Sequence, residues 1–107
     1  MRVQNRDMRL TDRQKERIRE TAAECFGSTV EVMVFGSRVD DSARGGDIDL
    51  LIITDTDGRS ARSAKIRFLV KLKQRIGDRH IDVVLQTPDT KESSIHAVAK
   101  REGVLLS

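Results

Sequence analysis

Residues 30–53 read VEVMVFGSRVDDSARGGDIDLLII, and this stretch decides how the rest of the chain is organised. An apolar run ends at Gly36-Ser37-Arg38, nine residues follow Ser37, and Asp47-Ile48-Asp49 then opens a second apolar run. Because side chains alternate along a strand, the carboxylates of Asp47 and Asp49 share one face. Carboxylates in an apolar strand are unfavourable unless a cation neutralises them, and hard divalent cations prefer oxygen ligands. The stretch therefore predicts two strands with a cation site where the second begins.

The Gly36-Ser37-Arg38 turn between these strands predicts a phosphate-binding corner. Ser37 has the pattern of the N-cap of a short helix that runs to about residue 43, where Gly45-Gly46 ends it. Backbone N–H groups at a helix N-terminus attract anions, and Gly36 has no Cβ to keep a phosphate away. The Ser37 hydroxyl could bond a phosphate oxygen or cap the helix, and Arg38 could clamp the same anion. Taken alone, a Gly-Ser turn is more often structural.

A third carboxylate, Asp82, interrupts the later apolar strand RHIDVVL at residues 79–85. If the second and third strands are neighbours, about 4.8 Å apart, Asp82 can reach the pair formed by Asp47 and Asp49. Three crowded carboxylates need cations, and two Mg²⁺ ions about 3.5–4 Å apart would also clamp a phosphoryl displacement. The alternative is that Asp82 is a solvent-exposed residue at a strand end, paired with Arg79 or His80.

Outward from this stretch, capping signals and hydrophobic periodicity define the remaining elements. A capping box at residues 11–14 opens a helix that ends at Gly27, and Ile66, Leu69, Val70 and Ile76 are expected on the inner face of the longest helix. The pattern predicts helices at 11–26, 60–76 and 90–101, and strands at 30–35, 47–54, 80–86 and 104–106. This order favours an α/β (α+β) fold, a small sheet covered by helices.

Length and composition indicate one domain, residues 1–107, with a flexible arm at 1–9. Only three aromatic residues occur, all Phe, so base stacking on single-stranded nucleic acid is poorly supported. The net charge of +3 fits a polyanionic or an acidic protein partner. The single cysteine, Cys25, is expected to be a buried helix residue and suits a reducing cytoplasm. No membrane span or signal peptide is evident, so a cytoplasmic location is expected.

The composite pattern resembles the nucleotidyltransferase domain of the DNA polymerase beta superfamily. The resemblance rests on Gly36-Ser37, nine intervening residues, Asp47-Ile48-Asp49, and Asp82 on a later strand. The phrase GSRVDDSARGGDIDLLI and the short length are similar to the minimal nucleotidyltransferase branch, over residues 11–106. One departure is Gly46, where many relatives have serine, and it removes no ligand. The resemblance implies a small mixed sheet covered by helices.

The resemblance also implies an activity, nucleotidyl transfer, with ATP as the donor and two Mg²⁺ ions as cofactors. Asp47 and Asp49 would hold both metals, and Asp82 would ligate the catalytic one and help to deprotonate an attacking hydroxyl. Gly36 and Ser37 would bind the β- and γ-phosphates of the nucleoside triphosphate, with Arg38 as a helper. The acceptor in this branch is often a tyrosine on a helical HEPN-type protein encoded nearby, and the pair forms a toxin–antitoxin module with the nucleotidyltransferase as antitoxin.

Two rival functions remain open on the sequence. The chain could neutralise its partner by docking alone, without catalysis, or modify a small molecule of the aminoglycoside kind. The chain has no tyrosine to modify on itself and no room for a second domain, which favours assembly as a homo- or hetero-oligomer. The basic helix at 60–76 is expected to be a solvated face, with an acidic protein or an RNA backbone as alternative contacts. His80 and His96 are expected at the surface or at strand ends.

Overall fold

The structure, a computed structural model, describes residues 10–35, 48–77, 80–91 and 93–106. The arm at 1–9, the short helix predicted from Ser37, and the residues Gly36, Ser37, Arg38 and Asp47 lie outside the described residues. The described elements follow the predicted order: α2 (Asp12–Phe26), β1 (Glu31–Phe35), β2 (Ile48–Ile53), α3 (Gly58–Ile76), β3 (Ile81–Gln86), α4 (Ser94–Glu102) and β4 (Val104–Leu105).

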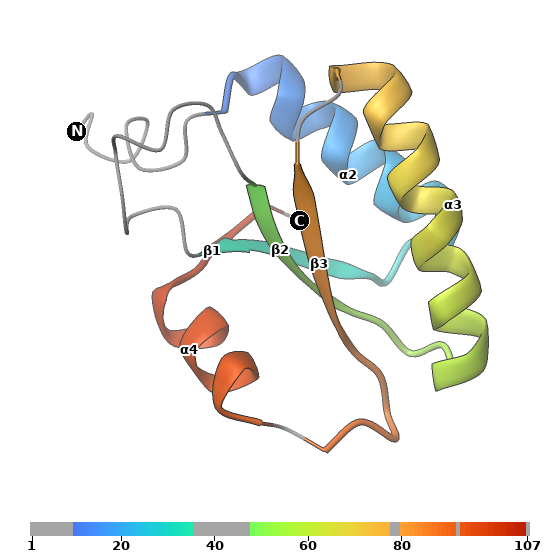
Figure 1. Cartoon of the computed structure of the whole chain (residues 1–107), viewed down its shortest axis with the longest axis vertical. Helices are drawn as coiled ribbons and strands as arrows, with labels where there is room; N and C mark the ends of the chain where they lie inside the picture. The colour runs from blue at the N-terminus through green and yellow to red at the C-terminus, as the bar shows by residue number, and fades with distance from the viewer. Residues whose placement is uncertain (1–9, 36–47, 78–79, 92, 107) are drawn as a thin grey trace.

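The strands form one mixed sheet in the order β3-β2-β1-β4. β1 runs antiparallel to β2 and β4, whereas β2 and β3 are parallel and are joined through α3. Helices α2 and α3 lie on one side of the sheet and α4 lies on the other (Figure 1). The predicted architecture, a small mixed sheet covered by helices, is therefore confirmed. In the described part of the chain, no helix combines the length and apolarity that crossing a membrane requires.

Helix α2 begins and ends where its sequence predicts. The Thr11 hydroxyl accepts a hydrogen bond from the Gln14 N–H, and the Gln14 side chain accepts one from the Thr11 N–H, both at 3.0 Å. This reciprocal pair satisfies backbone donors that a helix start leaves free. Gly27 ends the helix with φ of 103°, a conformation that glycine adopts without steric cost. The buried face of α2, with Ile18, then packs against the sheet.

Helix α3 lies on the sheet by a different face from the one expected. Its buried side chains follow helical spacing and are Ala61, Ala64, Phe68 and Leu72. Ile66 and Val70, expected inside, are exposed to solvent, while Leu69 and Ile76 are partly buried at the rim of the core. Small side chains at the first two buried positions let the helix approach closely, and Phe68 fills the interior. The prediction of the inner face was wrong for Ile66 and Val70.

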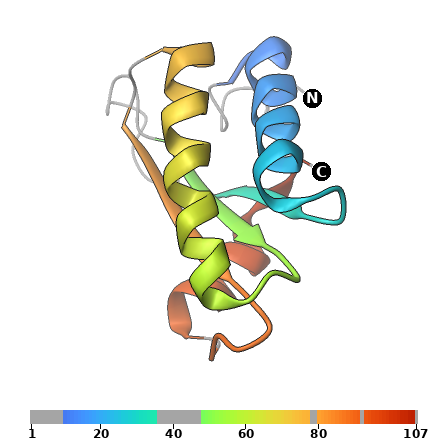
Figure 2. The same cartoon turned by 90° about the vertical axis from the view of Figure 1, so that its right-hand side faces the viewer.

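Helices α2 and α3 lie side by side and antiparallel over the sheet (Figure 2). Phe26 and Phe68 meet between them, with ring centroids 5.9 Å apart. Arg75 reaches back from α3 to bond the buried Thr21 hydroxyl at 2.8 Å and the Glu24 carboxylate at 3.0 and 3.1 Å. The hydrogen bond from Arg75 lowers the pKa of Glu24, and the charge of Lys71 lowers it further. The two helices are thus held by an aromatic contact and an ion pair.

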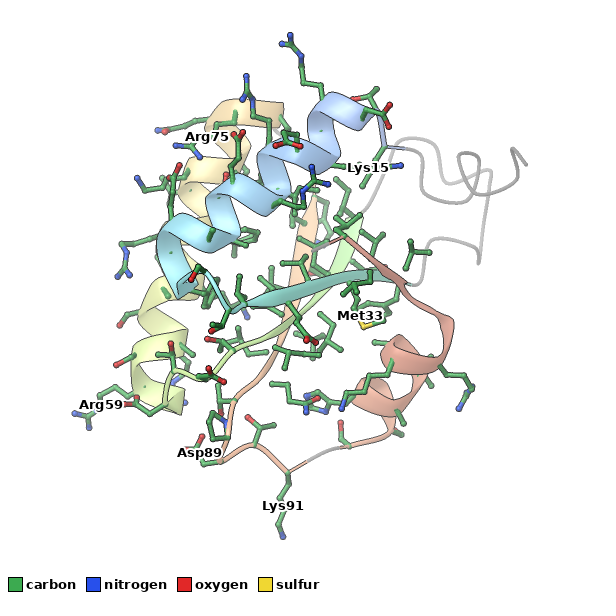
Figure 3. All side chains as sticks on the ribbon, turned by 180° about the vertical axis from the view of Figure 1, so that it is seen from behind. Lys15, Met33, Arg59, Arg75, Asp89 and Lys91 are labelled. Carbon is green, nitrogen blue, oxygen red and sulfur yellow. The ribbon has the colours of Figure 1, made fainter. Side chains whose placement is uncertain are left out.

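Helix α4 lies on the other face of the sheet, and hydrogen bonds of a histidine side chain hold it there. His96 is buried, not at the surface as expected from the sequence. Its Nδ1 accepts a hydrogen bond from the Ser93 N–H at 3.0 Å, so Nε2 carries the proton that it donates to the Leu85 carbonyl at 3.1 Å. One neutral ring therefore caps the start of α4 and ties it to β3. Met33 points from β1 toward α4 and packs beside it (Figure 3).

Replacing His96 by Ala is expected to destabilise the domain by about 1–3 kcal/mol, because the Ser93 N–H and the Leu85 carbonyl lose their partner in a largely buried place. Urea unfolding followed by circular dichroism measures this change. The matched control is His80→Ala, which removes the same ring from an exposed position and should change stability by less than about 0.5 kcal/mol. Equal effects of the two variants would contradict the role given to His96.

Candidate active site

Three residues on three adjacent strands form a row across the sheet, at the end where β1 finishes and where β2 and β3 begin. Phe35, at the end of β1, pairs with Asp49 on β2, and Asp49 pairs with Asp82 on β3. The start of β2 is joined to β3 by a hydrogen bond from the Ile48 N–H to the His80 carbonyl, at 3.0 Å. In-register residues of neighbouring strands point to the same face, with backbones about 4.8 Å apart. The carboxylates of Asp49 and Asp82 therefore share one face.

This face is the one that α4 partly covers. The alternate residues Ile48 and Leu50 belong to the core under α2 and α3, whereas Leu51 belongs to the smaller cluster against α4. Asp49 therefore projects on the α4 side, where it is half-buried. The surrounding apolar side chains lower the local dielectric and so strengthen any interaction between the carboxylates and a bound cation. Asp49 is held on the central strand β2, whereas Asp82 lies on the edge strand β3.

Asp82 is more exposed than Asp49 and has a partner of its own. Its Oδ1 lies 3.1 Å from His80 Nε2, and the two side chains are 59% and 63% exposed. This contact matches the alternative drawn from the sequence, an exposed strand-end aspartate paired with His80. The two observations are compatible, since an exposed imidazole can leave a carboxylate at little cost. Asp82 therefore stands opposite Asp49 and also has a close contact with His80, which directly precedes β3.

The donor set suits a hard cation as far as the structure describes it. Asp49 and Asp82 supply carboxylate oxygens, the ligands that Mg²⁺ prefers. Over residues 10–35, 48–77, 80–91 and 93–106, no three acidic, histidine or cysteine side chains come together as a metal site. The third predicted ligand, Asp47, lies outside these ranges, as do the predicted phosphate-binding residues. In the chain, Gly36 directly follows Phe35 and Asp47 directly precedes Ile48.

Phe35 is a member of this row that the sequence did not single out. Its ring is buried together with Leu51 and Ala99 in the smaller cluster against α4. The only signal in the sequence was its place immediately before Gly36, at the end of a strand. A buried aromatic residue there packs the end of β1 beside Asp49 and so helps to fix the position of that strand.

Other titratable groups with shifted pKa values in the described residues serve the fold. Hydrogen bonds from the Thr87 hydroxyl and from backbone N–H groups lower the pKa of Asp89, which lies near the start of α3. Burial raises the pKa of the Cys25 thiol, against the opposing charges of Arg67 and Lys71. Cys25 is partly buried and packs against the core. Its packing against the core is that of a structural helix residue, and the raised pKa is in keeping with this role.

Comparison with known families agrees with this geometry. The model of the nucleotidyltransferase domain family matches residues 15–106. The match spans most of the chain, from α2 to the end of β4, and includes the glycine–serine corner and all three aspartates. The chain belongs to the nucleotidyltransferase domain family. A comparison with curated proteins gives no significant match.

Proposed function

We propose that this protein is a minimal nucleotidyltransferase that transfers AMP from ATP to a hydroxyl group of a HEPN-type partner protein. By this modification it would act in the cytoplasm as the antitoxin of a toxin–antitoxin pair. The observation that carries the proposal is the facing pair Asp49 and Asp82 on neighbouring parallel strands. Membership of the nucleotidyltransferase domain family supports transfer of a nucleotide. The donor, the metal and the acceptor are inferred from the motif and from the chemistry of the chain.

Each site residue has a role in this proposal. Asp47, Asp49 and Asp82 would hold Mg²⁺, and Gly36, Ser37 and Arg38 would bind the terminal phosphates of ATP. Bound Mg²⁺ would neutralise charge on the transferred phosphoryl group and lower the pKa of the attacking hydroxyl. The hydroxyl oxygen bonds to the α-phosphorus, the bond from that phosphorus to the bridging oxygen breaks, and pyrophosphate leaves. Asp82, exposed at the edge strand, would accept the hydroxyl proton.

A protein acceptor is favoured by what this chain lacks. The sequence contains no tyrosine, so the chain cannot be its own tyrosine acceptor. The described residues form one four-stranded sheet with helices on both faces, and the carboxylate pair lies at the end of its strands. The half-buried Asp49 and the exposed Asp82 leave the carboxylate pair accessible to a large molecule. An acceptor that brings its own surface to this edge would complete the site.

The proposal is tested by incubating the purified protein with ATP, Mg²⁺ and the product of the adjacent gene, and then weighing both chains by intact-mass spectrometry. The expected result is a gain of one or more adenylate units on the neighbouring protein and none on this chain. Parallel reactions with EDTA, or with GTP, CTP or UTP in place of ATP, test the metal and the nucleotide.

Two results would contradict this function. Full neutralisation of the toxin by an Asp47→Asn/Asp49→Asn double variant would show that docking alone suffices. An unchanged mass of the neighbouring protein, with adenylation of an aminoglycoside under the same conditions, would assign the activity to a small molecule instead. A mass gain on the neighbouring protein that disappears with EDTA would exclude both alternatives.

A further inference from the structure

The outward face of α3 combines exposed apolar side chains with cations, and these side chains do not belong to the hydrophobic core. Ile66 and Val70, one helical turn apart, are 65% and 54% exposed. Arg59 and Lys73 lie seven residues on either side of Ile66, and Arg62 lies four residues before it, so helical periodicity places all five on one face. We call these residues, Arg59, Arg62, Ile66, Val70 and Lys73, the α3 outer face. It is an apolar centre flanked by cations.

The apolar centre lies outside the hydrophobic core. The core beneath α3 is made by Phe68 and its neighbours on the opposite side, and neither Ile66 nor Val70 belongs to it. β-Branched residues are weaker helix formers than Ala, Lys or Glu, so they are a poor choice for solvent-facing positions. Single exposed apolar residues are common on proteins, but two adjacent ones at the middle of a helix form a contiguous patch.

The charges of α3 also lack balance within the helix. Its sequence GRSARSAKIRFLVKLKQRI contains seven Lys or Arg residues and no acidic residue. Arg59 lies in the first turn, where the helix dipole disfavours a cation. Arg75, Lys71 and Arg67 face the α2 side, where they act on Glu24 and Cys25. Arg59 points away from the body of the domain (Figure 3). Arg62 also acts on Asp89 within the domain, so Arg59 and Lys73 are the outward cations offered to an external partner.

We propose that the α3 outer face docks the acceptor protein, through a surface that presents apolar side chains flanked by carboxylates. This inference rests on the proposed function, because it assigns the docking partner to the protein that receives the nucleotide. Charge complementarity selects an acidic partner, and the patch of Ile66 and Val70 selects one with apolar side chains. A second copy of this chain would bring two strongly basic helices together, so it is disfavoured. An RNA backbone would satisfy the cations and leave the apolar centre uncovered.

The test measures binding of the product of the adjacent gene by isothermal titration calorimetry. The variants Ile66→Asp/Val70→Asp and Arg59→Glu/Lys73→Glu are each expected to weaken binding at least tenfold. The matched control, Arg13→Glu/Arg101→Glu, reverses two exposed cations on α2 and α4 and should bind as the wild type does. Circular dichroism melting checks that every variant is folded. Binding by the wild type should also persist in part at 0.5 M salt, since apolar contacts are not screened.

Several results would overturn the docking surface. These are no binding of the neighbouring product by the wild type, unchanged binding by the α3 variants, or an equal loss in the control. If the surface instead bound RNA, the wild type would bind a fluorescent single-stranded RNA oligonucleotide, and high salt would abolish this binding. The Arg59→Glu/Lys73→Glu variant would lose RNA binding, whereas Ile66→Asp/Val70→Asp would keep it. The proposed function fails separately, because α3-dependent binding without any gain of mass would leave the docking surface standing and remove the transferase activity.

Discussion

Replacing Asp49 by Asn is expected to lower the rate of nucleotidyl transfer about a thousandfold or more, while the domain stays folded. The variant keeps the shape of the side chain and removes the charge that would hold the cation against the phosphates. Asn has the size and shape of Asp, and Asp49 is half-buried at the start of β2, so the substitution is expected to leave the domain folded. Initial rates of adenylate transfer and thermal melting measure the two effects.

A further measurement separates loss of the metal from loss of the fold. A cation that binds only the folded state raises the melting temperature, so Mg²⁺ should stabilise the wild type and leave Asp49→Asn unaffected. Glu31→Gln is the matched control, since it removes one exposed carboxylate from the opposite end of β1 and should keep both the rate and the Mg²⁺ response. Wild-type transfer by Asp49→Asn would contradict the assignment of the active site. A large loss of stability would show that Asp49 serves the fold instead.

Replacing Phe68 by Ala is expected to destabilise the domain by about 3–5 kcal/mol. Phe68 is fully buried under α3, and its ring contacts that of Phe26 on α2. Truncation removes the largest fully buried side chain of the described core and leaves a cavity that rigid strands cannot close. A domain of this size has about 5–15 kcal/mol of stability in total, so the variant should be close to unfolding. Urea denaturation gives the change in the free energy of unfolding.

The control on the same helix is Ile66→Ala, which also removes an apolar side chain but from the exposed face. Its effect on the free energy of unfolding should stay within about 0.5 kcal/mol, and the higher helix propensity of Ala should offset any loss of contact. A large loss at Ile66 with little change at Phe68 would mean that α3 is rotated about its axis relative to this structure. The same Ile66 variant should weaken binding of the partner, because the α3 outer face contains this residue.

Elements marked by local chemistry were predictable from the sequence. The capping box at Thr11 and the glycines at 27 and 77 place helix ends where the structure has them. The alternation around Asp82 likewise predicted a strand, and its in-register partner proved to be Asp49. These signals depend on residues a few positions apart, so they can be recognised in the sequence without knowledge of the fold. The roles of Asp49 and Asp82 in catalysis stay a prediction, and those of Asp47 and the glycine–serine corner concern residues outside the described ranges.

Features set by tertiary contacts were missed. Apolar residues occur on several faces of α3, and the sequence alone favoured the large aliphatic Ile66 and Val70 over the small Ala61 and Ala64. The structure buries the alanines because close approach of α3 to the sheet needs small side chains there. His96 was misplaced for a related reason: its burial depends on the Leu85 carbonyl, which is distant in sequence. No periodicity reveals such a partner.

The accessibility of Asp82 has a kinetic consequence. An edge open enough to admit a folded protein also admits water, which competes with the acceptor for the α-phosphorus. Such an enzyme would hydrolyse ATP in the absence of its acceptor, unless the catalytic arrangement formed only when the acceptor protein was bound. Its selectivity would then come from the encounter between two surfaces and not from the walls of a pocket. Such an enzyme would be inactive alone and activated by binding of the protein that it modifies.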